Sequence, residues 1–183
     1  MTIKNSRFAF MLLALFVFAG TAAAQSATVP RVTMTATVET VLRLDISNGA
    51  GGVIGGGTSS DFTVNLGNVN GQGIAPITGV TALVTPGAGI AGYAIYTTPI
   101  VLTPVFSGYA GNATIALTVG GGANDAIAVE GDSNATATLA AARPVVTGSL
   151  SDVPHTRHVG FKISKMEAVG ARTAMFLYTI TMP

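Results

Sequence analysis

The sequence predicts an all-β protein, a sandwich or barrel of roughly eight to ten strands. Threonine, valine and isoleucine dominate the segments after residue 24, and no segment there has a convincing helical period. Glycine-rich breaks separate these segments at the spacing typical of strands joined by turns. Cysteine is absent, so burial of apolar side chains and backbone pairing must stabilise the fold without disulfides.

Residues 1–24 have the layout of a cleaved secretory signal. A basic start contains Lys4 and Arg7, an apolar run extends from Phe8 to Ala19, and alanines occupy positions 22 to 24. The apolar run is shorter than the roughly 20 residues that a membrane span requires, so stable membrane insertion is not expected. We expect export through the Sec pathway, transit through the periplasm, and a mature chain that begins at Gln25 and is secreted or held at the cell surface.

A long alternation of apolar and polar residues follows the signal. The apolar residues at even positions are Val32, Met34, Ala36, Val38, Leu42, Leu44 and Ile46, and nearly all odd positions are polar. A period of two gives a strand one apolar and one polar face, but this run is about twice the usual strand length of 5–6 residues.

Two interpretations of this run remain open. In the first, it is the opening strand or strand pair of a self-contained sandwich. In the second, residues 25–40 are a donor extension that adds to the sheet of another subunit, and residues 41–183 form the sandwich domain. The donor face would then consist of Val32, Met34, Ala36 and Val38.

Further strands are expected from shorter alternating runs. The glycine-rich segment 48–61 is expected to form a turn or loop. Pro99 and Pro104 lack a backbone donor, so their segment is expected to be an edge strand or an interrupted one. The Ala-rich segment 134–142 is the nearest candidate for a short helix. The expected strands lie in FTVNLGNV (62–69), ITGVTALV (77–84), GYAIYTTPIVLTPVF (92–106), NATIALTV (112–119), AIAVE (126–130), NATATLA (134–140), HVGFKIS (158–164) and TAMFLYTITMP (173–183).

The charge of the chain does not indicate a nucleic-acid partner. Removing Lys4 and Arg7 from the nine basic residues leaves seven, against eight acidic ones. No charged residue occurs between Asp61 and Asp125, and the basic residues concentrate between Arg143 and Arg172. A near-neutral exported domain of this kind is not expected to bind nucleic acid or an anionic membrane surface.

The only cluster of chemically reactive side chains lies in SDVPHTRH, which contains Asp152, His155, Arg157 and His158. We interpret it as a polar loop before a strand, because residues 155 and 158 would point to opposite faces of an extended chain. A zinc site would need further ligands, and no cysteine or other histidine is present. No nucleophile elbow occurs either. No catalytic, cofactor-binding or metal-binding residue is therefore assigned, and no cofactor is expected.

The two ends of the chain resemble the subunits of bacterial chaperone–usher pili of the archaic branch, and the related spore coat U-like secreted domains. The resemblance rests on VTMTATVETVLRLDIS, on FTVNLGNV, on the closing TAMFLYTITMP, and on Gly170, the fourteenth residue from the end when Pro183 is counted as the first. Met182 stands where the family favours an aromatic residue, and the disulfide cysteines common in pilins are absent.

The resemblance implies an incomplete Ig-like, pilin-like β-sandwich that is completed by donor-strand exchange. In such a fold the carboxy-terminal strand borders an open groove, here with Phe176, Tyr178 and Ile180 at the acceptor edge. The chain is then expected to be a non-enzymatic subunit of a bacterial surface fibre or coat that self-associates with the help of a periplasmic chaperone and usher. A monomeric extracellular binding module, for example for a polysaccharide, is the alternative, and a secreted enzyme ranks last.

Overall fold

The structure is a computed structural model that describes residues 34–37, 39–57, 62–74 and 76–183. The chain divides into two units, Met1–Thr37 and Val38–Pro183. In the first unit, the described residues 34–37 form neither helix nor strand. Val32 and Val38 of the predicted donor face lie outside the described residues. All strands described below belong to the second unit.

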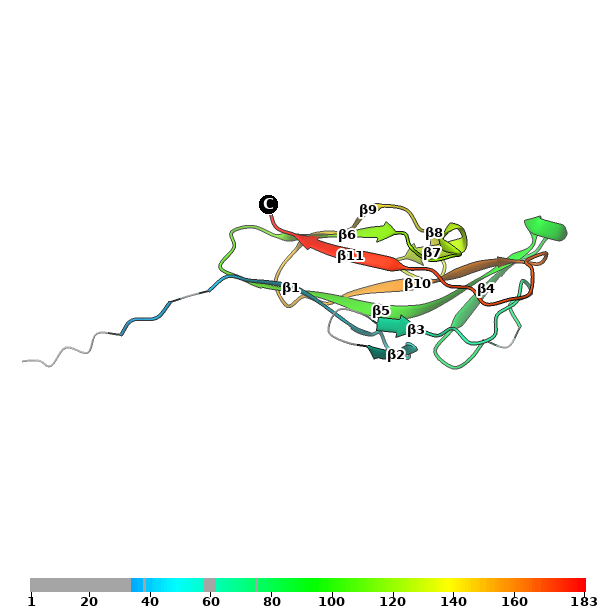
Figure 1. Cartoon of the computed structure of the whole chain (residues 1–183), viewed down its shortest axis with the longest axis horizontal. Helices are drawn as coiled ribbons and strands as arrows, with labels where there is room; N and C mark the ends of the chain where they lie inside the picture. Colours follow the sequence, from blue (N-terminus) through cyan, green and yellow to red (C-terminus); the bar gives the residue numbers. More distant parts are fainter. Residues whose placement is uncertain (1–33, 38, 58–61, 75) are drawn as a thin grey trace, which may run out of the picture. The chain divides into compact units, whose positions relative to one another are not determined.

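The second unit consists of antiparallel sheets (Figure 1), which confirms the all-β prediction. Eleven strands are assigned in the described residues, close to the expected eight to ten, and the shortest has two residues. Two 3-10 turns, η1 (Gly89–Ala91) and η2 (Asp125–Ile127), are also present. One sheet has the order β1 (Val41–Asn48), β5 (Tyr93–Ser107), β10 (His155–Ser164), β7 (Ala128–Gly131) and β8 (Thr138–Leu139), and β4 (Thr81–Thr85) pairs with the first part of β5. A second sheet has the order β11 (Phe176–Thr181), β6 (Ala113–Val119) and β9 (Arg143–Ser149), and β2 (Ile54–Gly57) pairs with β3 (Phe62–Val64).

The core lies between the two larger sheets, because alternate residues of their strands face inward. One buried cluster joins Ile100 and Leu102 of β5 and Val159 of β10 to Ile115 of β6 and Val146 of β9. A second buried cluster lies nearer the start of β5 and consists of Leu66, Val80, Ala94, Tyr96 and Ile163. Fully burying such a side chain contributes about 1.5–3 kcal/mol, so packing between the sheets stabilises the sandwich.

The prediction of an edge or interrupted strand around Pro99 and Pro104 is wrong, because β5 is continuous and central. The Pro99 carbonyl accepts from the N–H of Gly49 (3.1 Å), and the Pro104 carbonyl accepts from the N–H of Asp152 (2.8 Å). A strand residue directs its N–H and C=O to the same side. The missing N–H of Pro99 therefore faces the break between β4 and β1, and that of Pro104 faces the turn before β10. Neither proline removes a ladder bond.

Two other local expectations are also wrong. The glycine-rich segment 48–61 contains a short strand, β2, in addition to the turn that precedes it. The Ala-rich segment 134–142 contains β8 and no helix. There, Ser133 and Thr136 each donate a backbone N–H to the other's hydroxyl oxygen, at 3.0 and 3.2 Å. Such side-chain bonds to the backbone favour a turn over a helix.

Candidate functional site

The closing strand β11 is an edge strand. It pairs with β6 on one side and has no strand on its other side among the described residues. The Met175 carbonyl accepts from the N–H of Gly120 (3.3 Å), so the backbone N–H and C=O of Met175 are directed toward β6. Because directions alternate along an antiparallel pair, the N–H groups of Phe176, Tyr178 and Ile180 point to the free edge. This edge therefore offers unpaired backbone donors and acceptors.

The side chains of Phe176, Tyr178 and Ile180 share one face of β11, as the alternation predicts. All three are half-buried, whereas Leu177 between them is 58% exposed. Phe176 and Tyr178 pack against the buried cluster around Ile100. The inward face of β11 is thus only partly covered by the chain itself.

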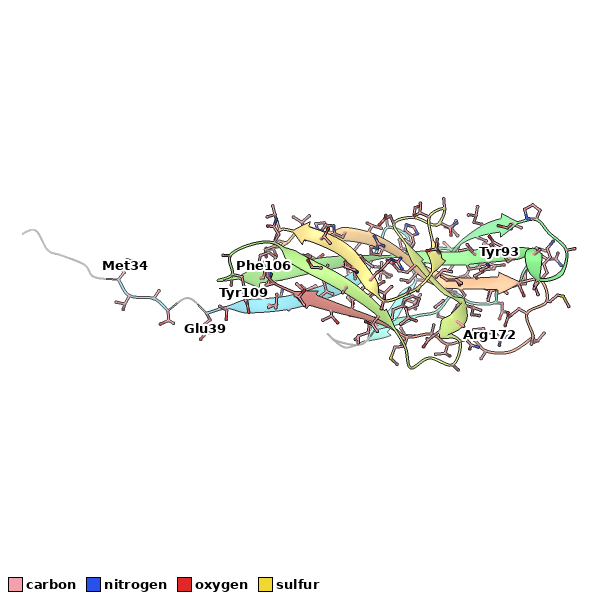
Figure 2. The ribbon with its side chains drawn as sticks, turned by 90° about the horizontal axis from the view of Figure 1, so that it is seen from above. Met34, Glu39, Tyr93, Phe106, Tyr109 and Arg172 are labelled. Carbon is pink, nitrogen blue, oxygen red and sulfur yellow. The ribbon has the colours of Figure 1, made fainter. Side chains whose placement is uncertain are left out.

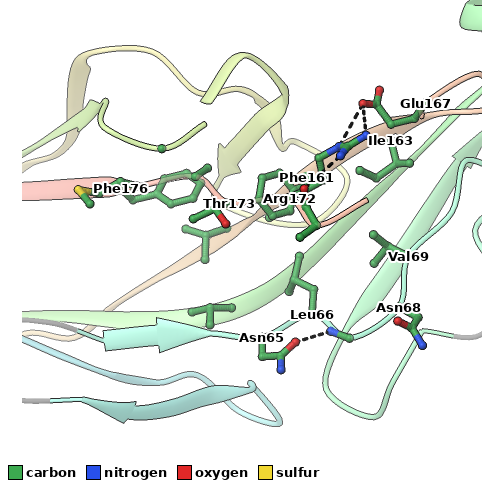
Figure 3. Close-up of a pocket in the computed structure, with 18 of the residues that line it drawn as sticks. Asn65, Leu66, Asn68, Val69, Phe161, Ile163, Glu167, Arg172, Thr173 and Phe176 are labelled. Atoms are coloured by element: carbon green, nitrogen blue, oxygen red, sulfur yellow. Dashed lines mark hydrogen bonds and ion pairs between the residues drawn. The ribbon is translucent and has the colours of Figure 1, made fainter. Parts of the chain in front are cut away.

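A groove of about 1330 Å³ lies beside this face, and its apolar lining includes Ile46, Ile100, Val159, Ile163, Phe176 and Tyr178. Ile180 does not line it. Figure 3 shows the segment from Asn65 to Val69 on one side of the groove and Thr173 and Phe176 on the other. From β10 the lining includes Val159, Gly160, Phe161, Ile163 and Ser164, and Lys165 follows them. The apolar residues of this lining could contact the apolar face of an added strand.

The loop from Lys165 to Met175 forms one rim of the groove, and an ion pair stabilises it. Arg172 Nη2 lies 2.9 Å from Glu167 Oε1, and Arg172 also donates to the carbonyl of Ala168. Gly170 lies in this loop with a φ of 152°, a backbone conformation that residues other than glycine rarely adopt. The glycine singled out in the sequence therefore has a local conformational role at the groove.

The described residues of the predicted donor face, Met34 and Ala36, are exposed, with Met34 at 89%. Neither belongs to the core clusters of the sandwich. Their role as a donor face stays a prediction, as does the role of Phe176, Tyr178 and Ile180 as the acceptor edge.

The sequence reasoning missed a buried ionic cluster centred on Glu130. Glu130 is fully buried on β7, with its Oε1 2.5 Å from Arg157 Nε of the neighbouring β10 and its Oε2 2.5 Å from Arg143 Nη2 of the opposite sheet. Arg157 also forms an ion pair with Asp132. The interpretation of SDVPHTRH as a loop is therefore wrong from His155 onward, because β10 begins there. Val159 and Ile163 lie on the inward face of β10. A period of two extended back from them to residue 157 would have predicted that Arg157 also faces inward.

The two histidines of this segment point to opposite faces of β10, as their spacing in a strand requires. His155 Nε2 is 2.6 Å from the hydroxyl of the buried Ser149. His158 Nδ1 has no partner, and burial together with the neighbouring Arg157 lowers the pKa of His158 below its usual 6.5. In the described residues no three His, Cys, Asp or Glu side chains are grouped to hold a metal ion.

Tyr178 lines the groove and also lies near the ionic cluster of Glu130. Its hydroxyl oxygen is buried and has no hydrogen-bond partner. Burial, and secondly the negative charge of Glu130, raise the pKa of Tyr178 above its usual value of 10.0. The folded protein therefore favours the neutral phenol. Above about pH 10 the tyrosine ionises more readily in the unfolded chain, so the free energy of unfolding falls as the pH rises.

We expect Tyr178→Phe to raise the free energy of unfolding by about 1 kcal/mol at pH 8, because it removes a buried hydroxyl without a partner. The gain should grow above pH 10, where an unfolded tyrosine ionises. Guanidinium unfolding at pH 8 and pH 10.5 measures both effects. Tyr109→Phe is the matched control, since Tyr109 is 41% exposed, and it should change neither value. A destabilised Tyr178→Phe would contradict the assignment of an unpartnered hydroxyl.

Comparison with known proteins identifies no relative: no protein-family model, curated protein or solved structure matches the chain. Within the part of the chain that the structure describes, no helix is long and apolar enough to cross a membrane.

Proposed function

We propose that this protein is an exported, non-enzymatic structural subunit of a surface fibre or coat, which assembles when the amino-terminal strand of a second copy fills the groove beside β11. The observation that carries the proposal is a groove, partly lined by apolar side chains, that lies beside the free edge of β11 at Phe176 and Tyr178. An unpaired strand edge with apolar surface is normally covered in a native protein, because it is a template for another strand. An added strand would pair the free N–H groups of Phe176 and Tyr178 and cover their side chains.

Residues 32–38 have the properties that the groove requires. Val32, Met34, Ala36 and Val38 alternate with three threonines, so an extended chain would present one apolar face to the groove. Seven residues of strand span roughly 23 Å, about the length of the stretch from Val159 to Lys165, of which all but Lys162 line the groove. Burial of four such side chains at about 1.5–3 kcal/mol each gives a large gross association energy before ordering costs are subtracted.

Export accounts for how such a subunit reaches its place of assembly. The basic, apolar and small-residue layout of residues 1–24 supports Sec-dependent export. An empty apolar groove would promote premature aggregation in the periplasm. A periplasmic chaperone that covers the groove would prevent this aggregation. The family resemblance implies such a chaperone, together with an usher, as partners.

The alternative is a monomeric binding module that holds an extended ligand, such as a polysaccharide, in the same groove. Gel electrophoresis of the secreted protein without boiling distinguishes the two. We expect a ladder of multimers that collapses to one band on boiling, because strand addition uses many backbone bonds together. A single monomer band at every concentration would contradict the fibre proposal and favour the binding module.

A further inference from the structure

The sandwich has two ends, which we define by the strand termini that meet there. The β1 end contains the start of β1, the end of β5 and the end of the chain: Val41 is opposite Ser107, and a β-carbon on Gly111 would lie 2.9 Å from Pro183. The η1 end contains η1, the start of β5 and the end of β10, where Ser164 is opposite Tyr93. In Figure 2, Phe106 and Tyr109 mark the β1 end, and Tyr93 and Arg172 lie toward the η1 end.

Exposed apolar side chains gather at the η1 end. Ile90 of η1 is 77% exposed, and Met166 in the loop after β10 is 70% exposed. The two segments are in contact, because the N–H of Lys165 donates to the carbonyl of Gly92 (2.9 Å) and a β-carbon on Gly89 would lie 3.3 Å from Met166 Sδ. Val169, fully exposed, belongs to the same loop. A single exposed apolar residue is ordinary, but several on adjoining loops suggest a contact surface.

The groove extends toward this end. Its lining continues along β10 to Ser164 and Lys165, which adjoin Tyr93 and Gly92 of the η1 end. β11 runs from the loop after β10 to the chain end beside Gly111, that is, toward the β1 end. Every pair in its sheet is antiparallel, and antiparallel pairing is slightly more stable per residue than parallel pairing. An added strand antiparallel to β11 therefore leaves the groove toward the η1 end.

The connection between the donor strand and its own sandwich is short. Only Glu39 and Thr40 separate Val38 from the first residue of β1. The three steps from Val38 to Val41 span at most about 11 Å in an extended chain, so the donor's sandwich must begin close to where its strand leaves the groove. The β1 end of the donor carries exposed apolar residues of its own: Val41 (40%), Tyr109 (41%), Leu150 (61%) and Val153 (39%).

We infer that subunits of the fibre also contact one another end to end, with Ile90, Met166 and Val169 at the η1 end of the acceptor packing against the apolar β1 end of the donor subunit. The inference rests on the proposed function, since it takes the donor strand as given. It adds a second interface, which the strand alone does not provide. Burial of apolar surface at both ends would then stabilise the fibre and limit bending between subunits.

The test measures two properties of the same full-length variants, the affinity for a donor peptide and the stability of the polymers. Ile90→Glu combined with Met166→Glu places two charges in the end-to-end contact, and Leu139→Glu, at a residue of β8 that is 51% exposed, is the matched control. We measure the affinity of each variant for a peptide spanning Arg31 to Glu39, and the rate at which excess peptide disassembles preformed polymers. The double variant should bind the peptide within twofold of the unsubstituted protein but lose its polymers at least tenfold faster. The control should match the unsubstituted protein in both.

Two failures are distinguishable. Disassembly of the double variant at the control's rate would overturn the end-to-end contact and leave the proposed function standing. Absence of peptide binding to every variant would overturn the proposed function and, with it, this inference. Val169→Glu repeats the test at a residue that is fully exposed in the monomer, so its folding should be unaffected, and circular dichroism verifies the fold of each variant.

Discussion

Polymers should be absent when Met34 and Ala36 are both changed to Asp. The change would place two unpaired charges in an apolar groove, and each charge is expensive to desolvate. A sandwich whose groove is filled by a supplied peptide of residues 31–39 should keep its secondary structure, because Met34 and Ala36 belong to none of its core clusters. Size-exclusion chromatography and circular dichroism, with and without the peptide, measure the two properties.

Thr35→Asp with Thr37→Asp is the matched control for this prediction. It adds the same charge to the same segment, but on the face that alternation directs away from the groove. The control should still form polymers. If instead Met34→Asp with Ala36→Asp unfolds the monomer and the peptide restores nothing, the segment belongs to its own core and the sandwich is self-contained.

Glu130→Gln should lower the free energy of unfolding by about 3–5 kcal/mol, because it removes the only buried carboxylate that pairs with Arg157 among the described residues and leaves the exposed Asp132 as its remaining partner. Glutamine has nearly the volume of glutamate, so the loss reports the charge and its bonds rather than a cavity. Guanidinium unfolding at neutral pH measures the loss. Because Glu130 bridges β10 and the opposite β9, the two sheets should also separate more readily.

Asp45→Asn is the control for an exposed pair. Asp45 and Arg43 lie 3.0 Å apart, with side chains 51% and 62% exposed. Exposed ion pairs contribute at most about 1 kcal/mol, so this change should be nearly silent. A Glu130→Gln variant as stable as Asp45→Asn would mean that the cluster around Glu130 contributes little to the stability of the fold.

The alternating runs predicted where strands would form, because a period of two is a local property of the chain. β1, β6, β10 and β11 all lie on such runs, and the shared face of Phe176, Tyr178 and Ile180 follows directly from that period. Pairing between strands is not local. The central place of β5 depends on which neighbours meet Pro99 and Pro104, and no window of the sequence contains those neighbours.

The same distinction applies to the candidate site. The family resemblance implied that the closing strand, β11, borders a groove, whereas Leu66, Val69 and Phe161 line it only because distant segments meet there. The partnership of Glu130 with Arg143 and Arg157 likewise brings three strands together. The inward position of Arg157 could have been predicted from the period of two along β10. It was not predicted, because residues before 159 were expected to form a loop.

Hydrogen exchange at the free edge of β11 tests the central claim most directly. The Met34→Asp with Ala36→Asp variant supplies a monomer with an intact groove, and the peptide of residues 31–39 supplies the donor. The amides of Phe176 and Tyr178 point to the free edge, whereas those of Leu177 and Thr179 point toward β6. If an added strand completes the sandwich, the peptide should slow exchange of the Phe176 and Tyr178 amides at least tenfold relative to the Leu177 and Thr179 amides. Unchanged exchange at Phe176 and Tyr178 with saturating peptide would contradict the account.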